Sequence, residues 1–450
     1  MCSERFGTLA GESGLVFSYA ANSQAGRLTR WVNDSVLPQG EENVFVRDDE
    51  NGLLWSLTRL PLGLNLPVRV RHAPGCTEYE TSGYGLYARM QCFTDGGIGA
   101  RAIHLKNEGT DARTLTLMHA AVFTIGDRPN AWQLCSLSRE EGGVLVAHPH
   151  LDGPACLCAL DGDPQRTATM SVGAYSGLWG SAPAALRGAL PCDAGNVGVL
   201  CYRLTLAPGE TRTIVSALCH APSRACLRDE KQRFCAQGAS RRLYEVRALW
   251  EGRLDGLHFD LPDRALQLML GRWLPYQVRA SRLWMRAGFY QAGGAVGFRD
   301  RLQDLLCLMP TEPDVVRAML LDAAAHQFEE GDVQHWWHPP RYGVRTRCSD
   351  DLLFLPFVCA QYVTVTGDET LLEESVPYLR EPPLAQGEAS RLTEPQVSDV
   401  SESVRLHCLR AIAHVGLGAH GLPLMGGGDW NDGMDRGGGE NGESAVSYTH

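Results

Sequence analysis

The sequence predicts an α+β protein with more than one domain, in which a β-rich half precedes a helical half. Three observations predict this class. Up to about residue 225, short apolar or alternating runs recur between turn signals, as expected of half-buried strands. Beyond residue 260, apolar residues recur at helical spacing instead. The length of 450 residues is too great for one ordinary hydrophobic core.

The first half is predicted to be a β-sandwich domain over residues 1–225. Residues 101–105 and 114–118 are strand-like runs separated by the turn-forming residues 107–111. A similar strand–turn–strand pattern spans residues 199–215. A large antiparallel sandwich is the natural way to bury so many strands on one face.

The second half is predicted to be helical. Residues 226–260 form a helical linker, because residues 239–250 make a charged amphipathic helix. Residues 261–450 form a further domain, with helices expected to begin near Asp263, Glu312, Ser349 and Glu402. Gly367 is expected to end the helix that begins near Ser349. Long polar loops rich in aromatic residues are expected between the helices, and function should reside there.

Composition excludes several classes of function. With 41 basic and 52 acidic residues, the net charge of −11 argues against binding nucleic acid or a membrane surface. No apolar run reaches the eighteen residues of a membrane span, and residues 1–6 do not resemble a signal peptide. Fifteen scattered cysteines without a CxxC pair indicate buried thiols in a reducing cytoplasm.

Residues 425–434, MGGGDWNDGM, combine groups suited to a sugar site. Consecutive glycines allow the backbone to approach a ligand closely. Trp430 can stack on a pyranose ring, while Asn431 and one of the two acids, Asp429 and Asp432, grip hydroxyl groups. The other acid can protonate a glycosidic oxygen. The alternative is an ordinary turn of Gly, Asn and Asp residues beside a buried tryptophan.

Residues 290–304 contain a second polar cluster. Arg299 offers a forked donor, and Asp300 and Asp304 offer two acceptors, a set suited to sugar hydroxyls. The alternative is the capped start of a helix with a surface ion pair.

Residues 331–351 contain a third cluster. Trp336 and Trp337 stand between two histidines and precede two prolines, which suggests an aromatic stacking wall. His335 and His338 have the three-residue spacing of some zinc ligands, but no third ligand is evident, so no metal is predicted. Ser349 is predicted to cap the helix that follows, with Asp350 in its first turn.

Together the segments YQAGGAVGFRDRLQD, GDVQHWWHPPRYGVRTRCSDDLLFLPF and HGLPLMGGGDWNDGM resemble glycoside hydrolase family 94, the inverting glycoside phosphorylases. Within that family, the resemblance is closest to the phosphorylase-like domains of cyclic β-1,2-glucan synthases and to 1,2-β-oligoglucan phosphorylases. It implies a sandwich followed by an (α/α)6 barrel, of which residues 261–450 would be an incomplete, truncated part. The family's phosphate-binding residues would lie further downstream, and unpartnered helix faces would expose apolar patches that favour aggregation.

The resemblance implies roles for individual residues. Asp432 corresponds to the general acid, Trp430 to a sugar-site tryptophan, and Arg299 and Asp304 to positions near the non-reducing-end glucose. The remaining candidates for substrate binding are Asp300, Trp336, Trp337, Arg345, Arg347, Asp350, Asp429 and Asn431. A second carboxylate is not needed, because phosphate arrives already anionic.

The expected reaction is reversible phosphorolysis of a β-linked glucoside, which gives α-glucose 1-phosphate. The expected partners are a β-glucan oligosaccharide and phosphate, the latter as co-substrate, with no cofactor. A homodimer is compatible with the resemblance, and the expected location is the cytoplasm.

Two rival functions remain open from sequence. A hydrolase would use water and need a base, for which Glu443 is a weak candidate, and phosphate dependence separates it from a phosphorylase. A non-catalytic module for β-glucan binding or chain-length control would bind sugar without turnover.

Overall fold

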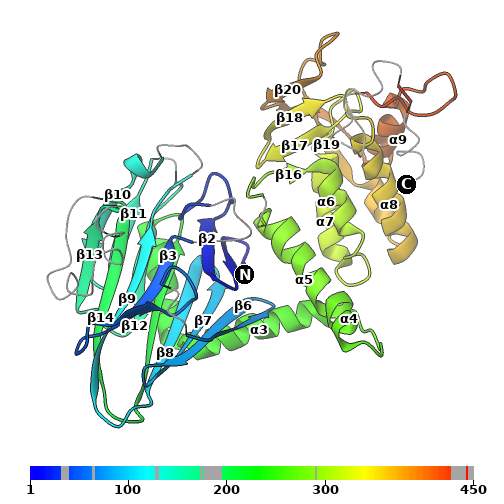
Figure 1. Ribbon diagram of the computed structural model, residues 1–450. Coiled ribbons are helices and arrows are strands. Elements are labelled where there is room, and N and C mark those ends of the chain that lie inside the picture. The colour runs from blue at the N-terminus through cyan, green and yellow to red at the C-terminus, as the bar shows by residue number, and fades with distance from the viewer. Residues whose placement is uncertain are drawn as a thin grey trace. The chain divides into compact units, whose positions relative to one another are not determined.

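A computed structural model describes residues 1–31, 40–62, 66–126, 131–149, 151–172, 175, 195–288, 291–426 and 442–443. Its contacts divide the chain into two compact units (Figure 1). The first comprises Met1–Leu254 and Arg279–Gly294, and the second comprises Asp255–Val278 and Ala295–His450.

The first unit is an antiparallel β-sandwich, as predicted. Its strands are β1 (Phe6–Gly11), β2 (Gly14–Ala20), β3 (Glu42–Asp48), β4 (Leu54–Ser56), β5 (Val68–Ala73), β6 (Cys76–Gly83), β7 (Leu86–Asp95), β8 (Ile98–Asn107), β9 (Arg113–Val122), β10 (Ser136–Glu140), β11 (Gly143–Ala147), β12 (Ala155–Asp161), β13 (Arg166–Met170), β14 (Val197–Leu206) and β15 (Thr211–His220). An eight-stranded sheet has the order β10-β11-β12-β15-β8-β7-β6-β5, and a five-stranded sheet has the order β13-β14-β9-β3-β4. The hairpin β1-β2 stands apart from both sheets.

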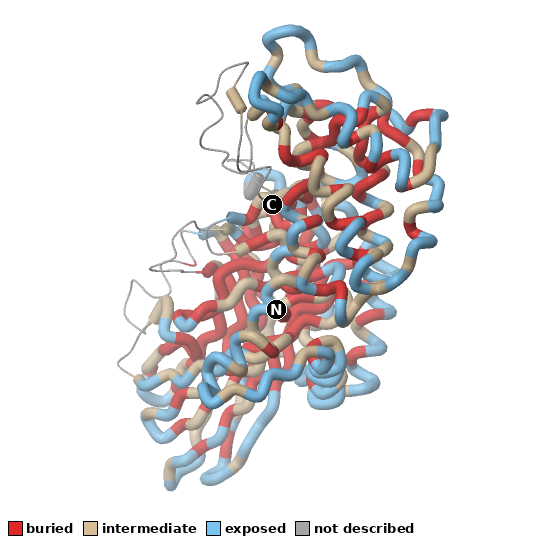
Figure 2. The backbone as a smooth tube through the Cα atoms, turned by 90° about the vertical axis from the view of Figure 1, so that its right-hand side faces the viewer, coloured by how far each residue is buried: buried red, intermediate tan, exposed pale blue. Residues whose placement is uncertain are grey.

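The two-residue period of β9 explains how this unit is packed. Leu115 and Leu117 join a hydrophobic cluster that draws residues from both sheets. Met118 and Ala120 point to the opposite face, into a second cluster with Val199. Figure 2 shows the buried residues concentrated along such strands. Since successive side chains of a strand face opposite ways, β9 is buried on both faces.

Two helices, α2 (Arg224–Gln237) and α3 (Ala239–Leu254), follow the strands and belong to the first unit. The amphipathic helix predicted over residues 239–250 is confirmed by α3, whose Trp250 is buried and packs against Trp284 with ring centroids 5.3 Å apart.

The second unit is mainly helical. Its first helical run consists of α4 (Arg264–Leu268), η3 (Met269–Trp273) and α5 (Leu274–Gln277), and it leads into η4 (Val278–Met285). The other helices are α6 (Phe298–Leu305), α7 (Pro313–Ala324), α8 (Asp351–Thr366), η5 (Glu369–Glu373) and α9 (Val404–His414). The predicted caps at Asp263 and Gly367 are confirmed, because the Asp263 carboxylate accepts from the Ala265 and Leu266 amides and Gly367 ends α8 with a φ of 72°. The prediction that Ser349 caps α8 was wrong, because Asp350 occupies the N-cap position of that helix, without a side-chain cap hydrogen bond.

Exposed apolar side chains mark α9 in particular. Leu406, Leu409 and Ile412 are exposed there, at fractions of 41–54%. Such a face favours association. Within the described part of the chain, no helix has the length and apolar character needed to cross a membrane.

The prediction that residues 331–348 form a loop was wrong, because they contain two strands. These are β17 (Gln334–His338) and β18 (Tyr342–Thr346), which join β16 (Val296–Gly297) and β20 (Ser390–Thr393) in a sheet of order β16-β17-β18-β20. A second small sheet pairs β19 (Ser375–Arg380) with β21 (Gln396–Ser403). The hairpin of β17 and β18 is local and contains Trp, Tyr, Val and Thr residues, which favour strands, so it could have been predicted. Its other partners, β16 and β20, are distant in sequence and leave no local signal.

A buried charge cluster joins the two sheets of the sandwich. Arg101 on β8 contacts the Glu42 carboxylate on β3 through Nε and Nη2, each at 2.9 Å. His119 on β9 lies 3.1 Å from the same carboxylate and 2.8 Å from the Ser216 hydroxyl on β15. Burial alone would raise the pKa of Glu42, but Arg101 and His119 outweigh it and hold that pKa at about 2.

The depressed pKa of Glu42 sets the sign of its contribution to stability. Its ordinary value is 4.5, so the unfolded chain takes up the proton more readily than the folded one. The stabilisation is therefore fully present above about pH 4.5 and is lost as the pH falls towards 2.

Replacing Arg101 should destabilise the sandwich. Arg101→Leu leaves the Glu42 carboxylate buried without its main partner, so the free energy of unfolding should fall by about 3–5 kcal/mol. Urea unfolding at neutral pH measures this loss. Arg212→Leu is the matched control, because Arg212 pairs with Glu210 at the surface and should matter little. Equal losses in the two variants would contradict a role for the buried cluster.

Candidate active site

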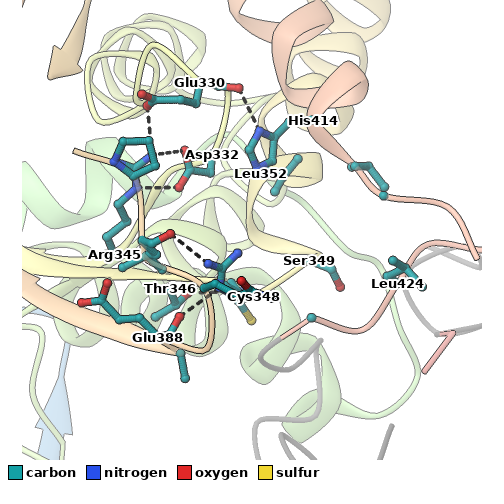
Figure 3. Close-up of a pocket in the computed structure, with 18 of the residues that line it drawn as sticks. Glu330, Asp332, Arg345, Thr346, Cys348, Ser349, Leu352, Glu388, His414 and Leu424 are labelled. Carbon is teal, nitrogen blue, oxygen red and sulfur yellow. Dashed lines mark hydrogen bonds and ion pairs between the residues drawn. The ribbon is translucent and has the colours of Figure 1, made fainter. Parts of the chain in front are cut away.

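A cavity of about 610 Å³ lies in the second unit (Figure 3). Its wall comes from β18, from the start of α8, from residues 383–389 after β19, and from residues after α9. It is lined by polar side chains or backbone groups of Glu330, Asp332, Arg345, Arg347, Cys348, Glu388 and Gly426. Clefts of this size are typical of small-molecule sites.

Arg345 is the most constrained side chain of this wall. It is almost fully buried, and its Nε and Nη2 donate to the two carboxylate oxygens of Asp332 at 2.7 and 2.6 Å. Nη2 also donates to Glu330 at 2.9 Å, and Nη1 donates to the Glu381 carbonyl at 3.1 Å (Figure 3 draws the two carboxylate partners). The guanidinium lies over the Phe328 ring. Arg345 therefore joins several segments of the cavity wall.

These contacts decide the charge state of Arg345. Burial alone would lower its pKa, but the hydrogen bonds and charges of Asp332 and Glu330 outweigh burial and raise it. The group thus stays a cation, and both carboxylates are held beside it. Sequence reasoning missed Asp332 and Glu330, because their pairing with Arg345 depends on the unpredicted β17-β18 hairpin.

Arg347 holds a different part of the wall. Its Nε donates to the Glu388 carbonyl at 2.9 Å, and its Nη2 donates to the Leu384 and Ala385 carbonyls at 3.0 and 2.9 Å. Arg391 adds hydrogen bonds to the Glu388 carboxylate. The segment that follows β19 is thereby fixed at the cavity by backbone contacts.

Arg299 and Asp350, predicted from separate sequence segments, are brought together. Arg299 Nη1 on α6 lies 3.1 and 3.3 Å from the carboxylate oxygens of Asp350, just before α8. The Cys348 thiol donates to the same carboxylate at 3.5 Å. Burial, followed by the charge of Asp351, raises the pKa of Asp350 despite the opposing charge of Arg299.

The two tryptophans predicted to form a stacking wall lie in different surroundings. Trp337 is buried, with its ring stacked on His326 at 3.8 Å and the Arg301 guanidinium 5.0 Å from its centroid. Trp336 is half-buried and meets His338 edge-on. Of the two, Trp336 is therefore the more accessible to a ligand.

The two acids predicted on α6 and Glu443, the candidate base of a hydrolase, lie in different surroundings. On α6, Asp300 is exposed and Asp304 is half-buried. Glu443 accepts from the backbone amide and from Nδ1 of His420, each at 2.7 Å. The hydrogen bond from the His420 amide is the main cause that lowers the pKa of Glu443.

The segment that precedes the acid motif reaches the cavity at Gly426. Asp429, Trp430, Asn431 and Asp432 lie outside the described residues, but Gly426 lines the cavity wall and pairs with Cys348 in an antiparallel bridge. Gly426 has a φ of 62°, and a Cβ there would lie 2.0 Å from the Arg347 carbonyl oxygen. Only glycine fits this close approach.

Two domain families match the chain. The supersandwich domain of glycosyl hydrolase 94 matches residues 1–236, and the catalytic domain of the glycosyl hydrolase 94 superfamily matches residues 249–450. Both matches are to domains of the same carbohydrate-related family. The chain belongs to glycosyl hydrolase family 94, and the resemblance seen in the motifs is confirmed.

Three curated proteins illustrate its relatives. The chain is 35% identical to the cyclic beta-(1,2)-glucan synthase NdvB of Rhizobium meliloti over 96% of its own length and 16% of that protein. It is 23% identical to the N,N′-diacetylchitobiose phosphorylase of Vibrio proteolyticus, over 99% of this chain and 60% of that protein. It is 25% identical to the solabiose phosphorylase of Paenibacillus borealis, over 89% of this chain and 51% of that protein. The chain thus spans a fraction of each relative.

Removing the Arg347 guanidinium should loosen the cavity wall. In Arg347→Met, the three carbonyls of residues 384–388 lose their donor, so the Ala385 and Glu388 amides should exchange with solvent several-fold faster, since local opening becomes cheaper. Hydrogen–deuterium exchange of the peptide around residues 383–391 measures this. Arg405→Met is the control, because Arg405 forms an exposed pair with Glu373. Unchanged exchange in Arg347→Met would show that Arg347 does not fix this segment.

Proposed function

We propose that this chain carries the acid-catalysing part of an inverting glycoside phosphorylase that acts on β-linked gluco-oligosaccharides, with β-1,2-linked glucans as the preferred class. The observation that carries the proposal is the pairing of Gly426 with Cys348 in the cavity wall. It anchors the residue that precedes the acid motif beside the Arg345–Asp332 and Arg299–Asp350 pairs.

The family relationship supports the reaction type, and the names of the relatives support the substrate class. Two of the relatives are named phosphorylases. The relative with the higher identity is named a cyclic beta-(1,2)-glucan synthase, which favours the β-1,2 linkage.

In the proposed reaction, Asp432 donates a proton to the glycosidic oxygen while a phosphate oxygen attacks C1 from the opposite face. The bond from C1 to the leaving oxygen breaks, the bond from C1 to phosphate forms, and the β configuration becomes α. Phosphate is already anionic, so no base is required. Asp432 must be protonated at the working pH, which burial beside Trp430 and neighbouring carboxylates would favour.

The cavity supplies groups suited to the sugar. Glu330, Asp332 and Glu388 provide carboxylate oxygens at the wall, and these can accept from hydroxyl groups. Arg299, Asp350 and Trp336 are not among the residues that line this cavity, and we keep them in the proposal as further candidate sugar contacts. Arg345 and Arg347 would act mainly by holding the wall, since their guanidinium groups donate to protein oxygens.

Replacing the proposed acid should abolish most phosphorolysis. In the full-length protein, which would supply the downstream phosphate-binding residues, Asp432→Asn keeps the side-chain shape but has no transferable proton, so cleavage of sophorose or longer β-1,2-glucans with phosphate should fall by about a hundredfold to ten-thousandfold. Release of α-glucose 1-phosphate is the measurement. Binding of the disaccharide should change little.

Two controls sharpen this test. Dinitrophenyl β-glucoside has a leaving group that needs no protonation, so the variant should recover most of its activity on it. Asp399→Asn alters a surface carboxylate that is 92% exposed and should leave the rate unchanged.

Near-normal phosphorolysis by Asp432→Asn would contradict the assignment and make Asp429 the next candidate. Cleavage without phosphate would favour a hydrolase, and binding without turnover would favour a carbohydrate-binding module.

A further inference from the structure

Three side chains of metal-ligand type converge where β17, β18 and the start of α8 meet. One ligand atom each from His335, Cys348 and Asp351 lies within 4.8 Å of the other two. Within this group, His335 Nδ1 is 2.6 Å from an Asp351 carboxylate oxygen. We propose that these three residues bind a transition-metal dication of the Zn²⁺ class.

The donor set favours such an ion. An imidazole nitrogen, a thiolate sulfur and a carboxylate oxygen are the ligands that Zn²⁺ takes in proteins, with bonds of about 2.0–2.3 Å. In a tetrahedral site these bonds place neighbouring ligand atoms roughly 3.3–3.8 Å apart. The cluster reaches that spacing if the short His335–Asp351 contact opens and the sulfur moves closer, each by about 1 Å or less. A hard cation such as Mg²⁺ does not favour a thiolate.

The position of the cluster also suits a cation. Asp351 is almost fully buried and adjoins Asp350, whose carboxylate lies 3.5 Å from the Cys348 sulfur. Of these two neighbouring carboxylates, Asp350 is paired with Arg299, and Asp351 contacts the titratable imidazole of His335. His335 keeps partial exposure, and Cys348 lines the cavity, where Figure 3 shows its sulfur. An ion can therefore enter from the cavity.

Three protein ligands leave the fourth tetrahedral position for water or a ligand in the cavity. Binding converts the Cys348 thiol to a metal-bound thiolate: the S–H bond breaks, the S–metal bond forms, and the proton passes to solvent. The inference does not rest on phosphorolysis, because the metal can be measured directly.

Cobalt titration of the metal-free chain tests the site. Co²⁺ should bind at one equivalent and produce a thiolate-to-cobalt charge-transfer band, which Zn²⁺ removes by competition and Mg²⁺ does not. Cys348→Ser should lose the band and weaken Zn²⁺ binding by about tenfold or more, since even outer partners of a metal site contribute that much. Cys226→Ser changes an exposed thiol on α2 and should keep both the band and the affinity.

The absence of a charge-transfer band in the wild-type chain, or an unchanged band and affinity in Cys348→Ser, would overturn the proposal. A second measurement needs no variant at position 348. X-ray absorption of the zinc-loaded Cys226→Ser chain should show one sulfur among nitrogen and oxygen ligands. A zinc coordination sphere without sulfur would overturn the proposal even if Cys348→Ser fails to fold.

Discussion

The paired contact between Arg345 and Asp332 is the interaction on which the candidate site depends. One buried guanidinium engages both oxygens of Asp332, the Glu330 carboxylate and the Glu381 carbonyl. These groups belong to segments that the chain brings together only on folding. Because a buried cation without such partners would be costly, the segments are held in one arrangement, and the shape of the cavity follows from it.

The sandwich also contains a buried arginine–carboxylate pair, but this pair lies between two sheets. Arg101 and Glu42 lie between the two sheets, with His119 and Ser216 as further polar groups beside an apolar cluster, and their contact joins the two sheets. In the second unit the corresponding charges border a cavity instead. A buried arginine thus organises each unit, but only the second presents carboxylates to a ligand-sized space.

Sequence patterns predicted the elements whose signals are local. The alternation of residues 114–118 predicted β9, and Asp263 and Gly367 marked helix ends that the structure confirms. The family was recognised from three motifs and is confirmed by both domain matches.

The pairing of strands that are distant in the chain could not be predicted from the sequence. The strand β18 pairs with β20, which lies more than forty residues further on, so the sheet around residues 331–348 could not be read from that segment alone. The contact between His335 and Asp351 was also missed, since the two side chains meet only when the start of α8 lies beside β17. The role of Asp432 rests on the family pattern and not on local geometry.

The stereochemistry of the first product tests the central claim most directly. Proton NMR of the reaction of the full-length protein with a β-1,2-glucan and inorganic phosphate reports the anomeric configuration of the first product. The account predicts α-glucose 1-phosphate as the first product, with no signal in the absence of phosphate. A first product of β configuration, or free glucose formed without phosphate, would contradict an inverting phosphorylase.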